Sequence, residues 1–299
     1  QHNIHLAGSL MLLDEDEVYN ALLLCDPHGR VWRYDKQYPW GWERGYFRDG
    51  NRITVAKTEL GDIGLMVCWD TAHRDLWARY AGRVDLMVIA SCPPNPAGRY
   101  RLPDGRILPY AEMVPPLASH ETDGEKVFGD MINEQTAWLG VPAVNSVGTG
   151  QVRTALPNAA GTVLSMAALN PSLLRYLPRA NQIELETDLI DACKVVAATG
   201  KPLAQRSQAE GEGYALATVT LAQEKPHPTM PQPPSPIGRP AYWLSDVLLP
   251  ALTIPTYRQG LRRAHGAHMA PLDSSTSRWA VLLGLLGLGA YLLGRGRRR

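Results

Sequence analysis

Cys68 is the residue of this sequence whose type and position best suit covalent chemistry. It ends the apolar run Leu65-Met66-Val67, and the chain turns polar directly after it. A cysteine is most often a small buried hydrophobe, and a reactive thiol is the exception. A thiol between a buried strand and the first turn of a helix is placed differently, because unpaired N–H groups there lower a thiol pKa and hold an oxyanion. The position therefore makes Cys68 a candidate nucleophile, which still needs a base.

Other reactive side chains give weaker signals when each is taken alone. Lys36 ends an expected strand, where a lysine is usually a surface charge, and Glu43 lies between it and Cys68. His73 falls in the start of the following helix and His28 in a turn, and the sequence places neither beside Cys68. The His, Cys, Asp and Glu residues show no spacing typical of metal ligands, so we expect no metal and no cofactor.

A strand, a helix and a second strand are the elements that must position Cys68. Residues 62–68 and 84–90 form continuous apolar runs, and residues 71–80 carry Leu76, Trp77 and Tyr80 at helical spacing. Strand, helix and strand in about thirty residues form a βαβ unit, so the two strands should be parallel and buried. We expect Thr71 to cap the helix.

Further elements complete one α/β unit over residues 1–222. The turn sequence Asp26-Pro27-His28-Gly29 predicts a β-hairpin. Residues 155–210 give mixed signals. The remaining expected elements are a strand near the N-terminus, a helix over 125–140, a short strand over 141–145 and a closing strand over 214–221.

The C-terminal quarter differs in composition. Seven prolines between residues 225 and 240 predict an extended linker, and residues 223–278 as a whole are interpreted as a linker with a possible interfacial segment. Residues 279–294 are uncharged and apolar, and the basic tail 295–299 follows. A helix of that length spans about 24 Å, slightly less than a hydrocarbon core of about 30 Å. We expect a transmembrane helix, with a buried core helix as the alternative.

Composition limits the class of protein. The 299 residues carry a net charge of +1, which gives no reason to expect nucleic acid as a partner. The cysteines, Cys25, Cys68, Cys92 and Cys193, form no CxxC pair, which favours unpaired thiols in a reducing compartment. Because the chain opens with Gln1 and its first residues already resemble a strand, we expect a fragment or a processed product.

Several short motifs occur in a fixed order around these residues. In that order and spacing they resemble the nitrilase superfamily, the carbon–nitrogen hydrolases, over residues 1 to about 150 and weakly again over 211–222. The motifs are Gly8-Ser9, Tyr19-Asn20, Pro27-x-Gly29, Tyr34-Asp35-Lys36, Glu43, Phe47-x-x-Gly50, Gly61-x-x-Gly64, Cys68-x-Asp70, Gly82-x-x-Asp85-Leu86 and Ala143-x-Asn145-x-x-Gly148.

The resemblance implies an α-β-β-α sandwich, here incomplete at its N-terminus, and a Glu–Lys–Cys triad. Cys68 would attack the carbon of an amide, carbamoyl or nitrile group, and the intermediate would be a thioester or thioimidate. Lys36 and the backbone N–H of Trp69 would stabilise the oxyanion, and Glu43 would orient the lysine and the substrate. The general-base glutamate of the family would lie before residue 1, so we expect this chain alone to be nearly inactive.

Two alternatives to a small-molecule hydrolase stay open. One is a membrane N-acyltransferase resembling apolipoprotein N-acyltransferase, which also joins such a domain to membrane helices. The other is a non-catalytic binding protein of the same fold. Arg74-Asp75 departs from the Pro-Glu of many relatives, and substrate inference by analogy is unsafe. We expect a homodimer and a single C-terminal membrane pass, with the cytoplasm slightly favoured for the catalytic domain.

Overall fold

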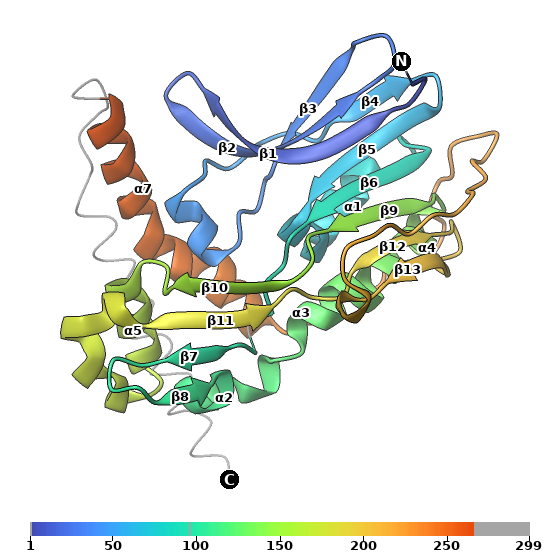
Figure 1. The fold of residues 1–299 in the computed structure, drawn as a ribbon. Helices are drawn as coiled ribbons and strands as arrows, with labels where there is room; N and C mark the ends of the chain where they lie inside the picture. The colour runs from blue at the N-terminus through green and yellow to red at the C-terminus, as the bar shows by residue number, and fades with distance from the viewer. Residues whose placement is uncertain (1, 96, 266–299) are drawn as a thin grey trace.

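A six-stranded sheet carries Cys68 at the end of one of its central strands. The computed structural model describes residues 2–95 and 97–265 (Figure 1). The strands of this sheet, in spatial order, are β13 (Pro202–Arg206), β12 (Cys193–Val196), β9 (Ala143–Val147), β6 (Leu86–Ser91), β5 (Gly61–Val67) and β4 (Val55–Thr58). The centre β9-β6-β5 is parallel, as continuous apolar runs predict, and the outer strands are antiparallel.

The predicted βαβ unit is confirmed, with one correction at its helix. Strands β5 and β6 are parallel neighbours, and helix α1 (Arg74–Tyr80) connects them. A short 3₁₀ turn, η2 (Cys68–Ala72), comes first, so the α-helix begins three residues later than predicted. Thr71 does not cap it, because its hydroxyl donates to the carbonyl of Cys68 at 2.8 Å.

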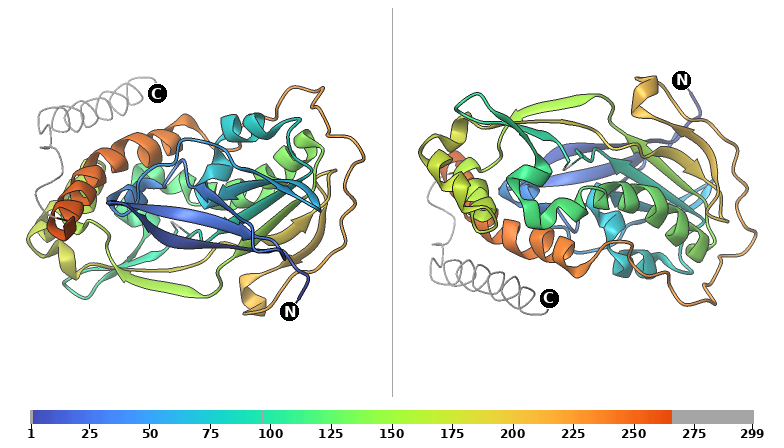
Figure 2. Two further views of the ribbon diagram at one scale, coloured as in Figure 1. Left: turned by 90° about the horizontal axis from the view of Figure 1, so that it is seen from above. Right: turned by 90° about the horizontal axis from the view of Figure 1, so that it is seen from below.

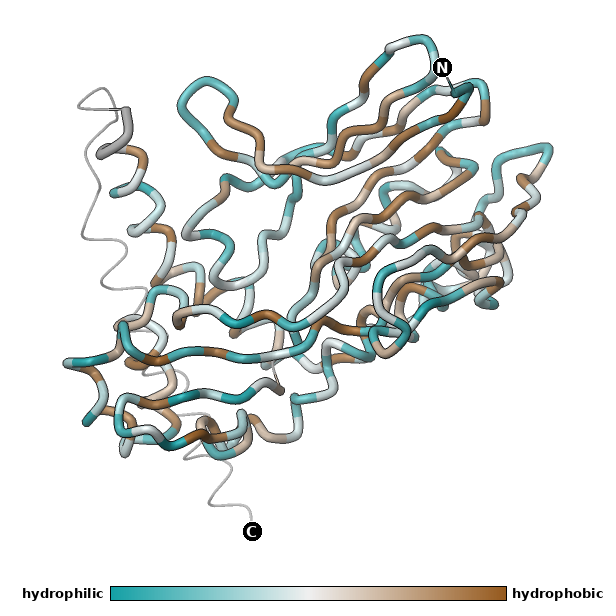
Figure 3. Tube along the Cα trace, viewed as in Figure 1, coloured by the Kyte–Doolittle hydropathy of each residue, from teal (hydrophilic) through white to brown (hydrophobic). Residues whose placement is uncertain are grey.

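A three-stranded antiparallel sheet covers one face of the large sheet, while helices lie against the other (Figure 2). It contains β1 (Leu6–Asp14), β2 (Glu17–Cys25) and β3 (Val31–Asp35). The predicted hairpin joins β2 to β3, and its turn is held by Asp26, which accepts from the backbone of His28 and Arg30. Figure 3 shows the apolar residues concentrated along the facing strands, where Leu22 and Leu24 pack against Ile63. This layer fixes the end of β3, where Lys36 follows.

A second module has a four-stranded sheet and its own apolar core. Its strands, in spatial order, are β10 (Gln151–Ala155), β11 (Glu184–Asp188), β7 (Arg99–Arg101) and β8 (Ile107–Pro109). Its core includes Tyr100, Met113 and Leu185. The helical segments around it are α2 (Tyr110–Met113), η3 (Pro115–His120), α5 (Ala159–Ala167) and η5 (Pro171–Gln182). This module accounts for much of the stretch whose pattern is mixed.

Two further predictions concern residues 123–139 and 214–221. A continuous helical run, α3 (Asp123–Lys126), η4 (Val127–Met131) and α4 (Ile132–Leu139), matches the expected helix, and β9 follows it as expected. The closing strand over 214–221 is wrong, because that stretch is neither strand nor helix. Tyr214 and Leu216 are about four-fifths exposed, so their alternation buries neither side chain against a sheet.

The proline-rich stretch after residue 222 lies against the domain. Residues 222–238 contain neither helix nor strand, yet Lys225 pairs with Asp62 and Asp85, and Gln232 bonds to Arg74 and Gln135. The chain then forms α6 (Arg239–Trp243), η7 (Leu244–Leu248) and α7 (Leu249–His265). Residues 222–265, which we call the C-terminal strap, therefore pack against the domain. The composition had predicted an extended linker in this part of the chain.

The structure does not describe the predicted membrane segment. Within residues 2–95 and 97–265, none of the helices combines the length and apolar character needed to cross a bilayer. The predicted span 279–294 and the basic tail 295–299 fall outside the described residues.

Lys194, on β12, is a buried lysine whose ammonium group donates hydrogen bonds to residues of η4 and α4. Its Nζ donates to the carbonyl of Gly129 at 2.7 Å and to Oδ1 of Asn133 at 2.9 Å. Burial lowers the pKa of Lys194 to about 8, and the charge of Asp130 offsets part of that effect. The folded state therefore releases this proton at a lower pH than the unfolded chain, whose lysines titrate near 10.4.

We expect this difference to make stability rise with pH. Between about pH 8 and pH 10 the unfolded chain binds more protons at Lys194 than the folded protein does, so the free energy of unfolding increases there by about 2 kcal/mol. In Lys194→Met that rise should be absent, while Lys201→Met, which alters an exposed lysine, should keep it. Urea unfolding at pH 7, 8, 9 and 10 measures the difference, and parallel curves for the wild type and Lys194→Met would contradict it.

Candidate active site

Cys68 occupies a backbone conformation that residues with side chains rarely adopt. Its φ is +52°, at the point where β5 ends and the η2 turn begins. For a non-glycine residue this left-handed conformation costs roughly 1–2 kcal/mol, and such residues gather at functional sites. The turn lifts the thiol out of the sheet, and the side chain is only partly buried.

Because Cys68 has a positive φ, we expect glycine to be more stabilising than alanine at this position, the reverse of the usual order. We expect Cys68→Gly to unfold with a free energy about 1 kcal/mol higher than that of Cys68→Ala, because glycine adopts a positive φ without strain. At Cys25, in the extended strand β2, the order should reverse, and Cys25→Ala should be the more stable variant. Chemical denaturation of the four variants tests this, and equal stabilities at position 68 would show that the turn is not strained.

Asp70 holds the turn that carries Cys68. Its side chain is completely buried, and its carboxylate accepts from the Tyr34 hydroxyl at 2.7 Å and from the backbone N–H of Val67 at 3.2 Å. The other oxygen accepts from the N–H groups of Gln37 and Tyr38. Burial raises the pKa of Asp70, an effect that the nearby Lys36 charge opposes. One carboxylate thus ties the nucleophile turn to the chain that follows Lys36.

Lys36 and Glu43 form an ion pair behind the thiol. The Lys36 side chain is completely buried, and its ammonium pairs with Oε2 of Glu43, in the 3₁₀ turn η1 (Gly41–Gly45). The same Oε2 accepts from the backbone N–H of Trp40 at 2.6 Å, and Oε1 accepts from the amide of Asn20 at 3.3 Å. Three donors therefore fix the orientation of Glu43, and Glu43 fixes the orientation of Lys36.

The charges at the site act on each other's protonation. Burial alone would lower the pKa of Lys36, but the negative charges of a Cys68 thiolate, Glu43 and Asp70 outweigh it and raise that pKa, so the lysine stays charged. Burial raises the pKa of the Cys68 thiol, while Lys36 lowers it and Glu43 raises it. The net shift of Cys68 is upward. The thiol is therefore protonated near neutral pH and needs an acceptor for its proton before it can attack.

A cavity of about 290 Å³ opens in front of the thiol. Cys68 and Glu43 line it together with Trp40, Trp42 and Phe128. Most of the wall is apolar, so charge that develops beside Cys68 interacts with Lys36 in a medium that screens it little. The cavity also contains His120, whose Nδ1 lies 2.7 Å from Oδ2 of Asp123.

Trp69 belongs to the site in a way that sequence did not suggest. Its side chain lines the cavity, and its indole N–H donates to Oδ1 of Asp246 at 3.0 Å. The other oxygen of Asp246 lies 3.0 Å from Nε2 of His73, whose ring stacks on Tyr38. Asp246 belongs to η7, so the C-terminal strap is attached directly to the residue after the nucleophile. The role predicted for the backbone N–H of Trp69 stays a prediction.

The C-terminal helices also hold the turn that bears Glu43. Thr253 of α7 donates its hydroxyl to the carbonyl of Gly41 at 3.2 Å. Gly41 has a φ of +42°, and a Cβ there would lie 2.8 Å from the Leu249 side chain. The positive φ favours glycine at the start of η1, and a larger residue would also displace the Leu249 side chain. The strap therefore supports both Glu43 and Trp69.

The structure brings Cys68, Lys36 and Glu43 together, with Trp69 beside them. Sequence reasoning did not single out Asp246 or His120, because neither lies near Cys68 along the chain. Asp70 was visible only as part of the Cys68-x-Asp70 motif. Among residues 2–95 and 97–265, no three His, Cys, Asp or Glu side chains converge as a metal site would require.

Comparisons with known proteins find similarity over the first third of the chain. The carbon–nitrogen hydrolase family model matches residues 1–104. A protein of Schizosaccharomyces pombe, described as a probable nitrilase, is 31% identical over 81 residues, which are 26% of this chain and 30% of that protein. The chain thus matches less than a third of that relative's length.

Solved structures with a similar arrangement include two hydrolases. The carbon–nitrogen hydrolase of Helicobacter pylori G27 has a TM-score of 0.46 at 17% identity, covering 69% of this chain and 59% of that one. The amidase of Nesterenkonia sp. AN1, with the acetamide moiety of fluoroacetamide on its active-site cysteine, has a TM-score of 0.44 at 18% identity, covering 69% and 57%. The segment of this chain that is similar to the carbon–nitrogen hydrolase family, residues 1–104, includes Lys36, Glu43 and Cys68.

Proposed function

We propose that the protein cleaves a non-peptide C–N bond of a small amide, carbamoyl compound or nitrile, with Cys68 as the nucleophile. One observation carries the proposal: a strained cysteine and the buried Lys36–Glu43 ion pair meet at an apolar cavity. Burying a lysine is costly unless its charge is used or paired. Here the charge is paired with Glu43 and interacts with Cys68, so it lies near the sulfur beside which a negative oxygen would form.

The proposed reaction on an amide has two halves. The Cys68 sulfur attacks the carbonyl carbon, and the C=O electron pair moves onto the oxygen, where Lys36 and the backbone N–H of Trp69 would stabilise it. The C–N bond breaks as the nitrogen takes up a proton, which leaves a thioester and releases ammonia or an amine. Water then attacks the thioester, and the acid leaves as the thiol regains its proton. With a nitrile the first intermediate is a thioimidate.

Glu43 is poorly suited to accept the proton of the Cys68 thiol. A carboxylate that already accepts three hydrogen bonds is a weak base. We therefore propose that Glu43 orients Lys36, and that a further carboxylate outside the described residues is the general base. On this proposal the part of the chain that the structure describes turns over amides slowly. Activated esters need no proton on their leaving group, so they acylate the fraction of Cys68 that has lost its proton to solvent, at a rate that rises with pH.

Release of ammonia distinguishes the hydrolase from its alternatives. A hydrolase should release ammonia from a primary amide in water, and a primary amine as co-substrate should not be required. An N-acyltransferase should form product only when an amine acceptor is added, and a non-catalytic binding protein should give neither product. Ammonia and acid are measured together with and without an added amine. Product that depends entirely on the amine would overturn the hydrolase proposal in favour of the transferase.

Membrane attachment and assembly are separate proposals. We propose that residues 279–294 anchor the protein to a membrane and that the basic tail 295–299 interacts with lipid headgroups. Deleting residues 279–299 should move the protein from the membrane pellet to the supernatant, whereas replacing only the arginines of the tail should weaken attachment less. Unchanged fractionation of the deletion variant would remove the anchor. A homodimer stays a prediction.

A further inference from the structure

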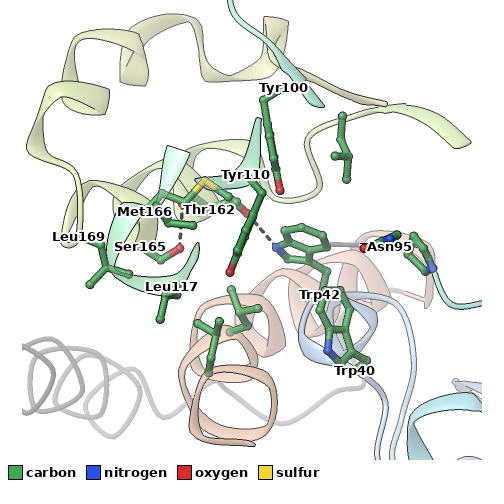
Figure 4. A pocket seen from close by; sticks show the side chains of 15 residues that line it. Trp40, Trp42, Asn95, Tyr100, Tyr110, Leu117, Thr162, Ser165, Met166 and Leu169 are labelled. Atoms are coloured by element: carbon green, nitrogen blue, oxygen red, sulfur yellow. Dashed lines mark hydrogen bonds between the residues drawn. The ribbon is translucent and has the colours of Figure 1, made fainter. Parts of the chain in front are cut away.

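The cavity at Cys68 adjoins a second, smaller chamber. This chamber has a volume of about 80 Å³ and lies between α5 and the loop that bears Trp40 and Trp42 (Figure 4). The two spaces share six lining residues, which are Trp40, Trp42, Pro94, Tyr110, Leu117 and Leu244. The two spaces are therefore neighbours, and a ligand that passes between these shared side chains would occupy both.

Most of the chamber wall is apolar and held in place. Trp42 donates its indole N–H to the Thr162 hydroxyl at 3.0 Å, and that hydroxyl donates to the carbonyl of Pro157 at 2.6 Å. Ser165, on the same helix, donates to the carbonyl of Thr162 at 2.8 Å. These bonds fix the position of α5 against Trp42, so the chamber is a preformed space.

Two tyrosine hydroxyl groups interrupt this apolar wall. Tyr100 and Tyr110 are 2% and 8% exposed, and both line the chamber. Within the described residues, neither hydroxyl has a hydrogen-bond partner. Figure 4 shows the Tyr100 hydroxyl directed toward Trp42 and the Tyr110 ring lying beside it. Each hydroxyl can donate a hydrogen bond to a group in the chamber, so these groups favour a ligand atom that accepts one.

We propose that the chamber selects the substrate, and that the substrate is an amide or nitrile with an extended apolar chain that carries a hydrogen-bond acceptor near its far end. The inference rests on the proposed function for the reacting end only. At about 30 Å³ per group, the main cavity holds roughly ten water-sized groups and the chamber about three more. A chain of roughly eight to ten atoms beyond the reacting carbon fits this space, whereas acetamide leaves most of it empty.

The residues that make the chamber lie mostly beyond the segment that matches the carbon–nitrogen hydrolase family. That match ends at residue 104, while Tyr110, Thr162, Ser165 and Leu249 come from α2, α5 and α7. The matched segment supplies the reacting groups. The second module and the C-terminal helices supply most of the surface that would recognise the substrate's tail.

Acylation of Cys68 by p-nitrophenyl esters of different chain length tests the inference. The acetate, hexanoate and nonanoate are compared with the 7-methoxyheptanoate, in which an oxygen replaces one carbon of the chain. Each methylene that becomes buried is worth about a fourfold gain. We expect the acylation rate constant to rise at least tenfold from acetate to nonanoate, and the ether to exceed nonanoate about threefold. Tyr100→Phe should remove the advantage of the ether alone.

A matched pair of variants locates the effect in the chamber. Ser165→Leu puts a larger side chain into it and should slow the nonanoate about tenfold, while the acetate rate stays unchanged and shows that the fold is intact. Ala160→Leu makes a similar enlargement on the exposed face of α5 and should change neither rate. Equal rates for all chain lengths, with Cys68 acylated, would overturn the chamber proposal and leave the nucleophile in place.

Binding without reaction separates the two proposals. In Cys68→Ala, quenching of tryptophan fluorescence should show nonanamide binding at least tenfold more tightly than acetamide, and Ser165→Leu should remove that difference. If no ester acylates Cys68 but this binding preference is found, the proposed function fails and the chamber proposal holds. Equal binding of the two amides overturns the chamber proposal.

Discussion

Cys68→Ala is expected to abolish acylation and turnover, with a fall of about four orders of magnitude or more in the rate constant. The sulfur forms the new covalent bond, and no other atom at the turn can replace it. Cys25→Ala should keep wild-type activity, because Cys25 ends β2 and does not line the cavity. The rate of p-nitrophenolate release from p-nitrophenyl butyrate measures both variants.

Cys92 is a second thiol that lines the same cavity, so the experiment must also determine which of the two cysteines is acylated. Burial raises its pKa, and the nearby Glu43 charge raises it further while Lys36 lowers it. If Cys68→Ala retains most of the acylation rate and the label maps to Cys92, the nucleophile has been assigned wrongly.

Lys36→Met is expected to have the second largest effect, on both activity and stability. Removing the positive charge takes away the group proposed to stabilise the oxyanion, and it removes the charge that lowers the pKa of Cys68. We expect acylation at pH 7 to fall by about two to three orders of magnitude, and the rise of rate with pH to move to higher pH. Glu43 is left without its partner, so the free energy of unfolding should fall by about 3 kcal/mol.

A second substitution separates these two effects. Glu43→Gln in the Lys36→Met background removes the unpaired charge and should restore most of the lost stability, because the oxygen of the new side-chain amide can still accept from the Trp40 N–H. It should restore none of the lost activity. Recovery of activity in the double variant would show that Lys36 acts only through folding, and would contradict its role at the oxyanion.

The elements around Cys68 were predictable because local sequence determines them. Continuous apolar runs over 62–68 and 84–90 identified two buried parallel strands, and the Asp26 turn identified the hairpin. The helix start was displaced because Asp70 accepts from the N–H of Val67 and stabilises a 3₁₀ turn first. The stretch 214–221 alternates like a strand, but the described residues offer it no strand to pair with, and without pairing alternation produces no strand.

The chemical site was predictable in part, for a related reason. Motif order placed Cys68, Lys36 and Glu43 together, although nothing local shows that a lysine at a strand end will be completely buried. Asp246 lies 177 positions from Trp69, and the hydrogen bond between their side chains depends on how the C-terminal strap packs against the domain. The chamber walls likewise come from segments distant in sequence. Long-range packing of this kind has no signature in composition or periodicity.

The most direct test of the account is the mass of the protein after reaction with p-nitrophenyl butyrate. Quenching in acid and peptide mapping should find one butyryl group, on Cys68, in the wild type. The group should be lost on treatment with hydroxylamine, and it should be absent in Cys68→Ala and scarce in Lys36→Met at the same time point. A wild-type protein that stays unmodified, or that carries the butyryl group on another residue, would contradict the account.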